Sequence, residues 1–114
     1  MISRKALDRA EKDDSIRRRW NKFANEIEMI ARNPEERPRE KIGDFLVSPR
    51  GYGGSAAPRI AWTFDSSTNT LTVYDLLYHV DSQRYVDNWN HQARDGRITR
   101  KTYERNGFED FRGP

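Results

Sequence analysis

RIAWTFDSSTNTLTVYDLLYH, residues 59–79, is the stretch that decides the fold of this chain. Ile60, Trp62 and Phe64 alternate with smaller or polar residues, which is the period-two pattern of a half-buried strand. Residues 65–69 are all turn formers. Residues 71–78 resume with β-branched, aromatic and apolar side chains, which favour a second strand. The stretch therefore predicts a β-hairpin on which the core is built.

The composition indicates one small, polar domain. The chain has 114 residues, of which 34% are hydrophobic and 34% are charged. A core this lean leaves a thin margin of stability, so we expect part of the surface to serve a partner. The net charge of +3 comes mostly from arginine, whose planar guanidinium suits phosphate oxygens.

Several classes of protein are excluded or disfavoured by what the sequence lacks. There is no cysteine, which excludes disulfides and Cys-based zinc sites. No apolar run approaches the ~20 residues that span a membrane, and the first residues lack the apolar core of a signal peptide. We expect a cytoplasmic protein without a membrane partner.

The first part of the chain predicts two helices. Residues 3–12 form a short helix, and Asp13 to Ser15 interrupt it and offer an N-cap. The next helix carries a single apolar stripe that ends before Asn33-Pro34. The stripe consists of Ile16, Trp20, Phe23, Ile27 and Ile30. We expect the two helices to form an antiparallel hairpin that lies across a sheet.

The remaining segments complete the predicted architecture. Residues 42–47 read as a strand, residues 48–58 as a glycine-rich loop, and residues 82–94 as a helix. The predicted fold class is α+β, with an N-terminal helical hairpin packed on a small antiparallel β-sheet and a C-terminal helix. We assign residues 1–94 to a single domain and residues 95–114 to a C-terminal extension.

Common catalytic signatures are missing. The sequence has no P-loop, Rossmann fingerprint, HExxH motif or Ser-His-Asp signature. The loop SPRGYGGSAAP, residues 48–58, does not match a phosphate-cradling motif, and a mobile surface loop is the favoured interpretation. We expect no metal and no cofactor.

Arg59 and His79 are the candidate catalytic pair. A hairpin that closes at residues 65–69 brings both residues to the same end, next to Lys41 and Arg50 on the neighbouring segment. Such a group of residues resembles the catalytic groups used for RNA cleavage. In that reaction the 2′-hydroxyl attacks the adjacent phosphate while one group removes a proton and another supplies one. Cations stabilise the extra charge of the transition state, and no metal is required. A histidine at a strand end is, however, more often a surface or edge residue.

Two further regions offer supporting residues. Glu40 is a candidate base, although a surface charge beside its basic neighbours is the favoured interpretation. Basic and aromatic residues are interleaved from Arg84 to Phe111, an arrangement that holds phosphates and stacks bases. Arg84 and Tyr85 are the candidates there, and packing on the sheet is the favoured role for Tyr85 and Trp89.

Three segments together resemble the RelE/ParE superfamily, the toxins of bacterial type II toxin–antitoxin modules. SIRRRWNKFANEIEMIARNP is similar to the family's second helix, and REKIGDFLVSPR to its connector and second strand. RIAWTFDSSTNTLTVYDLLYHV is similar to its hairpin, especially in the YoeB-like branch. The resemblance covers roughly residues 3–80, and it implies that residues 1–94 form a RelE-like domain.

The resemblance implies a function and a set of partners. It implies a metal-independent endoribonuclease that cleaves mRNA on the ribosome and is covered by a cognate antitoxin protein. Arg59 falls at the place of a transition-state-stabilising arginine and His79 at that of a catalytic histidine. Glu40 or Lys41 falls near the catalytic glutamate or the basic residues of the earlier strand. Lys41, Arg50 and Arg84 are the expected phosphate-binding residues, with Tyr85 beside them.

Two other functions remain open. Family members begin with an extra strand, for which only Met1 and Ile2 are available here. Val80 stands where the YoeB-like pattern has a tyrosine, which leaves a ParE-like inhibitor of DNA gyrase open. The third reading is a non-catalytic accessory protein that binds nucleic acid or a host protein.

Overall fold

The computed structural model describes residues 1–48 and 58–111, apart from the side chains of residues 79–83. Within these residues the chain forms a six-stranded sheet and five helices, so the predicted mixed α+β class is confirmed. The elements are β1 (Ile2–Ser3), α1 (Arg4–Lys12), α2 (Asp14–Arg18), α3 (Trp20–Arg32), β2 (Glu40–Ile42), β3 (Phe45–Val47), β4 (Arg59–Asp65), β5 (Thr70–Leu77), α4 (His79–Arg94), α5 (Arg100–Glu104) and β6 (Phe108–Glu109).

The hairpin predicted from residues 59–79 is present as β4 and β5. The two strands pair antiparallel from Arg59 opposite Leu77 to Asp65 opposite Thr70. The turn between them spans residues 66–69, as its composition predicts. Asn69 adopts a positive φ of 51°, a conformation that asparagine tolerates better than most residues.

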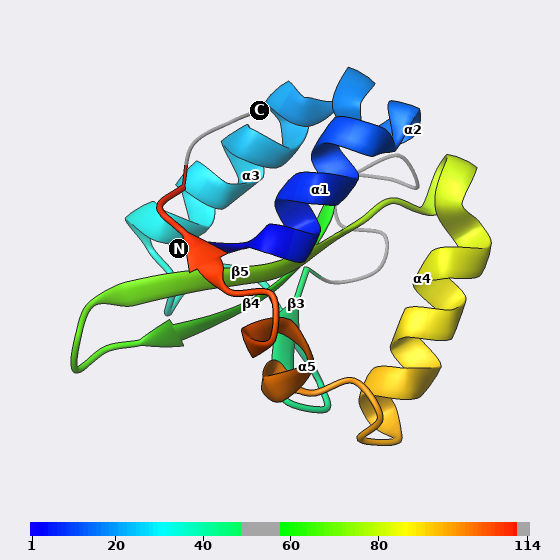
Figure 1. Cartoon of the computed structure of the whole chain (residues 1–114). Helices are drawn as coiled ribbons and strands as arrows, with labels where there is room; N and C mark the ends of the chain where they lie inside the picture. Colours follow the sequence, from blue (N-terminus) through cyan, green and yellow to red (C-terminus); the bar gives the residue numbers. More distant parts are fainter. Residues whose placement is uncertain (49–57, 112–114) are drawn as a thin grey trace.

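The sheet has the order β2-β3-β4-β5-β1-β6 (Figure 1). β1 pairs parallel with β5, whereas the other four pairings are antiparallel. The sheet is therefore mixed, and larger than the small antiparallel sheet that the sequence predicts. β1 escapes prediction because it has only two residues; its Ile2 is fully buried between two neighbouring strands.

The N-terminal part forms three helices where the sequence predicts two. α1 begins after Ser3, whose hydroxyl accepts a hydrogen bond from the Ala6 amide and caps the helix. The Asp13 side chain caps α2 in the same way. The predicted second helix is broken at Arg19, which has φ −109° and ψ 17°. Its apolar stripe is confirmed, since Ile16, Phe23, Ile27 and Ile30 are buried and Trp20 is half-buried.

Two hydrophobic cores lie on opposite faces of the sheet. α1, α2 and α3 cover one face, and α4 and α5 lie on the other (Figure 1). Residues that alternate along β4 face alternate cores, with Ile60 and Trp62 in the first and Ala61 in the second. The second core gathers Phe45, Trp89 and Tyr103, whose rings pack at tilted or edge-on angles.

Residues 42–47 contain the end of β2, a two-residue turn and β3, where the sequence predicts a single strand. Gly43 turns the chain between β2 and β3 with a φ of 57°. A Cβ atom at this position would lie 2.2 Å from the Ala93 carbonyl oxygen of α4. The glycine is therefore required both by its conformation and by the close approach of the turn to α4.

The C-terminal segment contributes to the same sheet and core. α4 begins at His79, three residues earlier than the sequence predicts. Beyond it, Tyr103 of α5 is fully buried and β6 pairs with β1. Among the described residues no helix is long and apolar enough to cross a membrane.

Candidate functional site

Arg59 and Glu40 form an ion pair at the end of the β4–β5 hairpin. The Arg59 Nη2 atom lies 3.0 Å from Glu40 Oε1, and its Nε donates to the Ser48 carbonyl oxygen at 2.8 Å. The Arg59 side chain is only 5% exposed, whereas that of Glu40 is 42% exposed. The structure thus brings two of the predicted catalytic residues together, with the carboxylate on the solvent side of the guanidinium.

His79 is the first residue of α4, which begins at the same end of the hairpin as this pair. The sequence predicts that His79 ends the second hairpin strand, but β5 ends at Leu77 and His79 is the first helical residue. Leu77 pairs directly with Arg59, so the start of α4 lies at the same end of the hairpin. The His79 side chain lies outside the described part of the structure.

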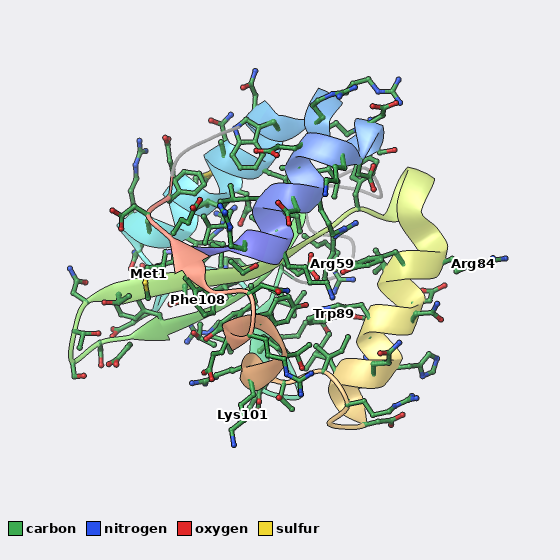
Figure 2. The ribbon with its side chains drawn as sticks, viewed as in Figure 1. Met1, Arg59, Arg84, Trp89, Lys101 and Phe108 are labelled. Atoms are coloured by element: carbon green, nitrogen blue, oxygen red, sulfur yellow. The ribbon has the colours of Figure 1, made fainter. Side chains whose placement is uncertain are left out.

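The predicted phosphate-binding residues are spread over several elements. Lys41 is exposed on β2, next to Glu40 in the chain. Arg84 is exposed on α4 and points away from the sheet (Figure 2). Arg50 lies outside the described residues. The described residues contain no group of three His, Cys, Asp or Glu side chains placed to hold a metal ion.

Tyr85 is directed into the protein rather than toward this site. Its hydroxyl donates a hydrogen bond of 2.6 Å to Asp75 Oδ2. The Arg9 guanidinium covers its ring at 3.7 Å from the centroid. Tyr85 therefore has the packing role that its sequence context favours, and its ring is already stacked on one face.

Asp75 is the centre of a buried polar network that the sequence did not reveal. Its carboxylate is fully buried and accepts hydrogen bonds from Arg9 at 2.9 Å, from the Leu76 amide at 2.8 Å and from the Tyr103 hydroxyl at 2.7 Å, besides that from Tyr85. These donors come from α1, β5, α5 and α4. Because a buried carboxylate is costly unless its oxygens are satisfied, the network fixes these four elements to one another.

The tyrosines of the network are held in their protonated form. Burial and the negative charge of Asp75 raise the pKa of Tyr85 and of Tyr103 far above the ordinary value of 10.0. Tyr103 in turn accepts a hydrogen bond of 2.7 Å from Trp89 Nε1. Both hydroxyls therefore remain donors to Asp75 throughout the neutral pH range.

A β-bulge turns Asp75 toward its partners. Ala61 pairs with Asp75 but Trp62 pairs with Val73, so Tyr74 is an extra residue in β5. The extra residue shifts the alternation of side chains, and Asp75 shares a face with Tyr85 and Tyr103. The sequence evidence for this network is the lone acidic residue inside the apolar run VYDLLY, because a charge within a buried strand requires partners.

On the other side of Asp75, Arg9 seals the edge of β5. β1 pairs with β5 only at Val73, so it does not cover the edge beyond that point. The Arg9 guanidinium reaches past the end of β1 and donates both to Asp75 and to the Leu76 carbonyl oxygen. This contact satisfies a strand-edge acceptor that would otherwise lack a partner.

Comparisons with known proteins found no relative: no protein-family model matches the chain, and neither a curated protein nor a solved structure is significantly similar to it.

Proposed function

We propose that this chain is a RelE-like toxin that cleaves mRNA without a metal ion. The observation that carries the proposal is the Arg59–Glu40 ion pair at the hairpin end where His79 begins α4. RNA cleavage through the 2′-hydroxyl requires a cation and two groups that transfer protons. Arg59, the half-exposed Glu40 and His79 are residues of these kinds at one end of the sheet. The strand β1 ahead of α1 also agrees with the family pattern, in which a strand precedes the first helix.

The proposed reaction is an internal transphosphorylation. Glu40 or His79 removes the proton of the 2′-hydroxyl, whose oxygen then bonds to phosphorus. The bond from phosphorus to the 5′-oxygen breaks, and the other of the two groups protonates that leaving oxygen. The products are a 2′,3′-cyclic phosphate and a 5′-hydroxyl, so no water is consumed in this step.

Arg59 has a defined task in this scheme. A phosphate at the hairpin end competes with Glu40 for the guanidinium, because both are anions that pair with its N–H groups. Exchange of the carboxylate for a phosphate oxygen places Arg59 against the developing charge. The same exchange releases Glu40, which is then able to accept a proton. Lys41 and Arg84 extend the positive charge along the RNA.

The partners and location follow from the same proposal. A toxin of this kind acts on mRNA at the ribosome in the cytoplasm, and a cognate antitoxin protein keeps it silent. A charged surface around a lean core suits such a partner, because exposed charges give an antitoxin complementary contacts.

A non-catalytic binding protein is the second candidate. It is favoured by the burial of Arg59, which has protein acceptors on both Nε and Nη2. In this reading the arginine ties β4 to the chain around Ser48 and Glu40, and the basic surface contacts nucleic acid or a protein. A ParE-like gyrase inhibitor is a variant of this reading that needs no catalytic histidine.

Induced expression in a bacterial host separates the candidates. The ribonuclease proposal expects growth arrest and new mRNA 5′ ends, both lost in His79→Ala and in Glu40→Gln. His91→Ala is the matched control, because His91 is exposed near the other end of the same helix. Arrest that persists unchanged in His79→Ala, with intact mRNA, contradicts the ribonuclease. A DNA-damage response in its place points to gyrase.

A further inference from the structure

The positive charge of the chain is concentrated at its start. Residues 1–22 contain eight Lys and Arg against four Asp and Glu, whereas the remainder contains 13 against 14. The excess therefore lies on α1, on α2 and on the first residues of α3. An asymmetry of this kind is typical of a surface that meets a polyanion.

α1 lines an open hollow with basic side chains. The hollow measures about 500 Å³ and is lined by Lys5, Asp8, Arg9, Lys12 and Asp13. The three cations follow the spacing i, i+4 and i+7, which places them on one face of the helix. Lys5 and Lys12 are two turns apart, about 10 Å along the axis. This separation is too long for one phosphate group and suits a chain of them.

The wall of the hollow is fixed in place by the Asp75 network. Arg9 is 14% exposed, and its guanidinium is held between the Asp75 carboxylate and the Tyr85 ring. The Lys5 ammonium lies 5.5 Å from the centroid of the Tyr103 ring. Because Asp75 and the Leu76 carbonyl oxygen already accept hydrogen bonds from the Arg9 guanidinium, Arg9 forms a fixed wall of the hollow, and Lys5 and Lys12 supply its available positive charge.

Asp8 and Asp13, the two carboxylates that line the hollow, offset its positive charge to different extents. Asp13 caps α2 through the amides of Ser15 and Ile16, and one of its oxygens lies 3.7 Å from Arg9. Its charge is therefore partly satisfied within the protein. Asp8 is exposed and remains as a single negative charge beside the two lysines.

We propose that this face of α1 binds the phosphate backbone of a single-stranded RNA, with Lys5 and Lys12 on separate phosphates. The inference rests on the proposed function for its choice of RNA. Lys5 and Lys12 supply charge without base readout, so binding is independent of sequence and depends strongly on salt. The face would hold RNA away from the Arg59–Glu40 pair and lengthen the contact with the strand.

The test measures binding apart from cleavage. A fluorescein-labelled uridine 12-mer is titrated by anisotropy with the His79→Ala chain over a range of salt concentrations. The test variant adds Lys5→Gln and Lys12→Gln, which remove charge and keep most of each side-chain stem. The control adds Lys101→Gln and Arg105→Gln, which remove two exposed cations of the α5 region; Lys101 projects away from α1 (Figure 2).

The expected result is a loss confined to the α1 variant. Two lost phosphate contacts lower the slope of log K against log salt by about 1.4, which weakens binding by about 25-fold at 0.1 M salt. The control variant is expected to keep the slope of log K against log salt that the His79→Ala chain shows. Equal losses in both variants, or an unchanged slope in the α1 variant, overturn the inference. So does displacement of the RNA by polyglutamate as effectively as by unlabelled RNA, because the partner is then an acidic protein.

The outcome is separable from that of the proposed function. Binding that depends on Lys5 and Lys12 establishes the surface even if the chain with His79 intact cleaves nothing. Cleavage that depends on His79 together with an unchanged slope refutes the surface and leaves the ribonuclease standing.

Discussion

Replacing Tyr103 with phenylalanine removes one oxygen atom from the centre of the Asp75 network. That oxygen donates to Asp75 at 2.7 Å and accepts from Trp89 Nε1 at 2.7 Å. A hydrogen bond to a charged group contributes about 1.5–3 kcal/mol, and a buried donor left without an acceptor costs about 1–3 kcal/mol. The ring contact with Phe45 is kept. We expect Tyr103→Phe to lower the free energy of unfolding by about 3 kcal/mol.

Urea unfolding followed by circular dichroism measures this loss, with an unchanged m-value as evidence that both chains unfold in the same way. Tyr74→Phe is the matched control. Tyr74 belongs to the same aromatic cluster, but among the described residues the hydrogen bond of its hydroxyl is that with Thr63 Oγ1, at 3.4 Å. A bond this long is weak, so we expect a loss below about 1 kcal/mol. Equal losses in the two variants would refute the central role given to the Asp75 carboxylate.

Two further predictions concern the turn at Gly43 and alkaline pH. Gly43→Ala should destabilise the fold by about 3 kcal/mol or more, because its Cβ meets the Ala93 carbonyl oxygen. Gly96→Ala, which also has a positive φ but open space around it, should cost only about 1 kcal/mol in the same urea assay. The folded-state pKa values of Tyr85 and Tyr103 are raised, so the two tyrosines contribute fully to the free energy of unfolding below pH 10. Above pH 10 that contribution is lost at about 1.4 kcal/mol per pH unit for each tyrosine. Tyrosinate absorbance and stability measured from pH 9 to 12 check this slope, which the double phenylalanine variant should lack; an identical slope in that variant contradicts the assignment.

The hairpin was predictable because its pattern is local. Alternation along β4 and turn chemistry at residues 66–69 depend only on neighbours in the sequence, and both survive in the fold. The apolar stripe of α3 was predictable for the same reason. The break at Arg19 was not, because no proline or glycine marks it and the stripe continues across it.

The features that escaped prediction depend on distant contacts. The bulge at Tyr74 changes the phase of β5, so strict alternation assigns Asp75 to the wrong face. Its partners Arg9 and Tyr103 lie 66 and 28 residues away in the chain. At the candidate site, the proximity of Arg59 to Lys41 and its segment was expected from the topology. The ion pair with Glu40 itself required the turn at Gly43, which lengthens the strand region back to residue 40.

The place of β1 between β5 and β6 governs the order in which this chain can fold. Ile2 is opposite Val73 on one side and Glu109 on the other. The backbone of Ile2 is therefore paired on both sides only after residues 73 and 109, both distant in sequence, have reached it. Contacts this far apart in sequence slow folding. Because α1 packs on β5, its apolar face stays uncovered until the β4–β5 hairpin has formed, and species that fold before that step expose it.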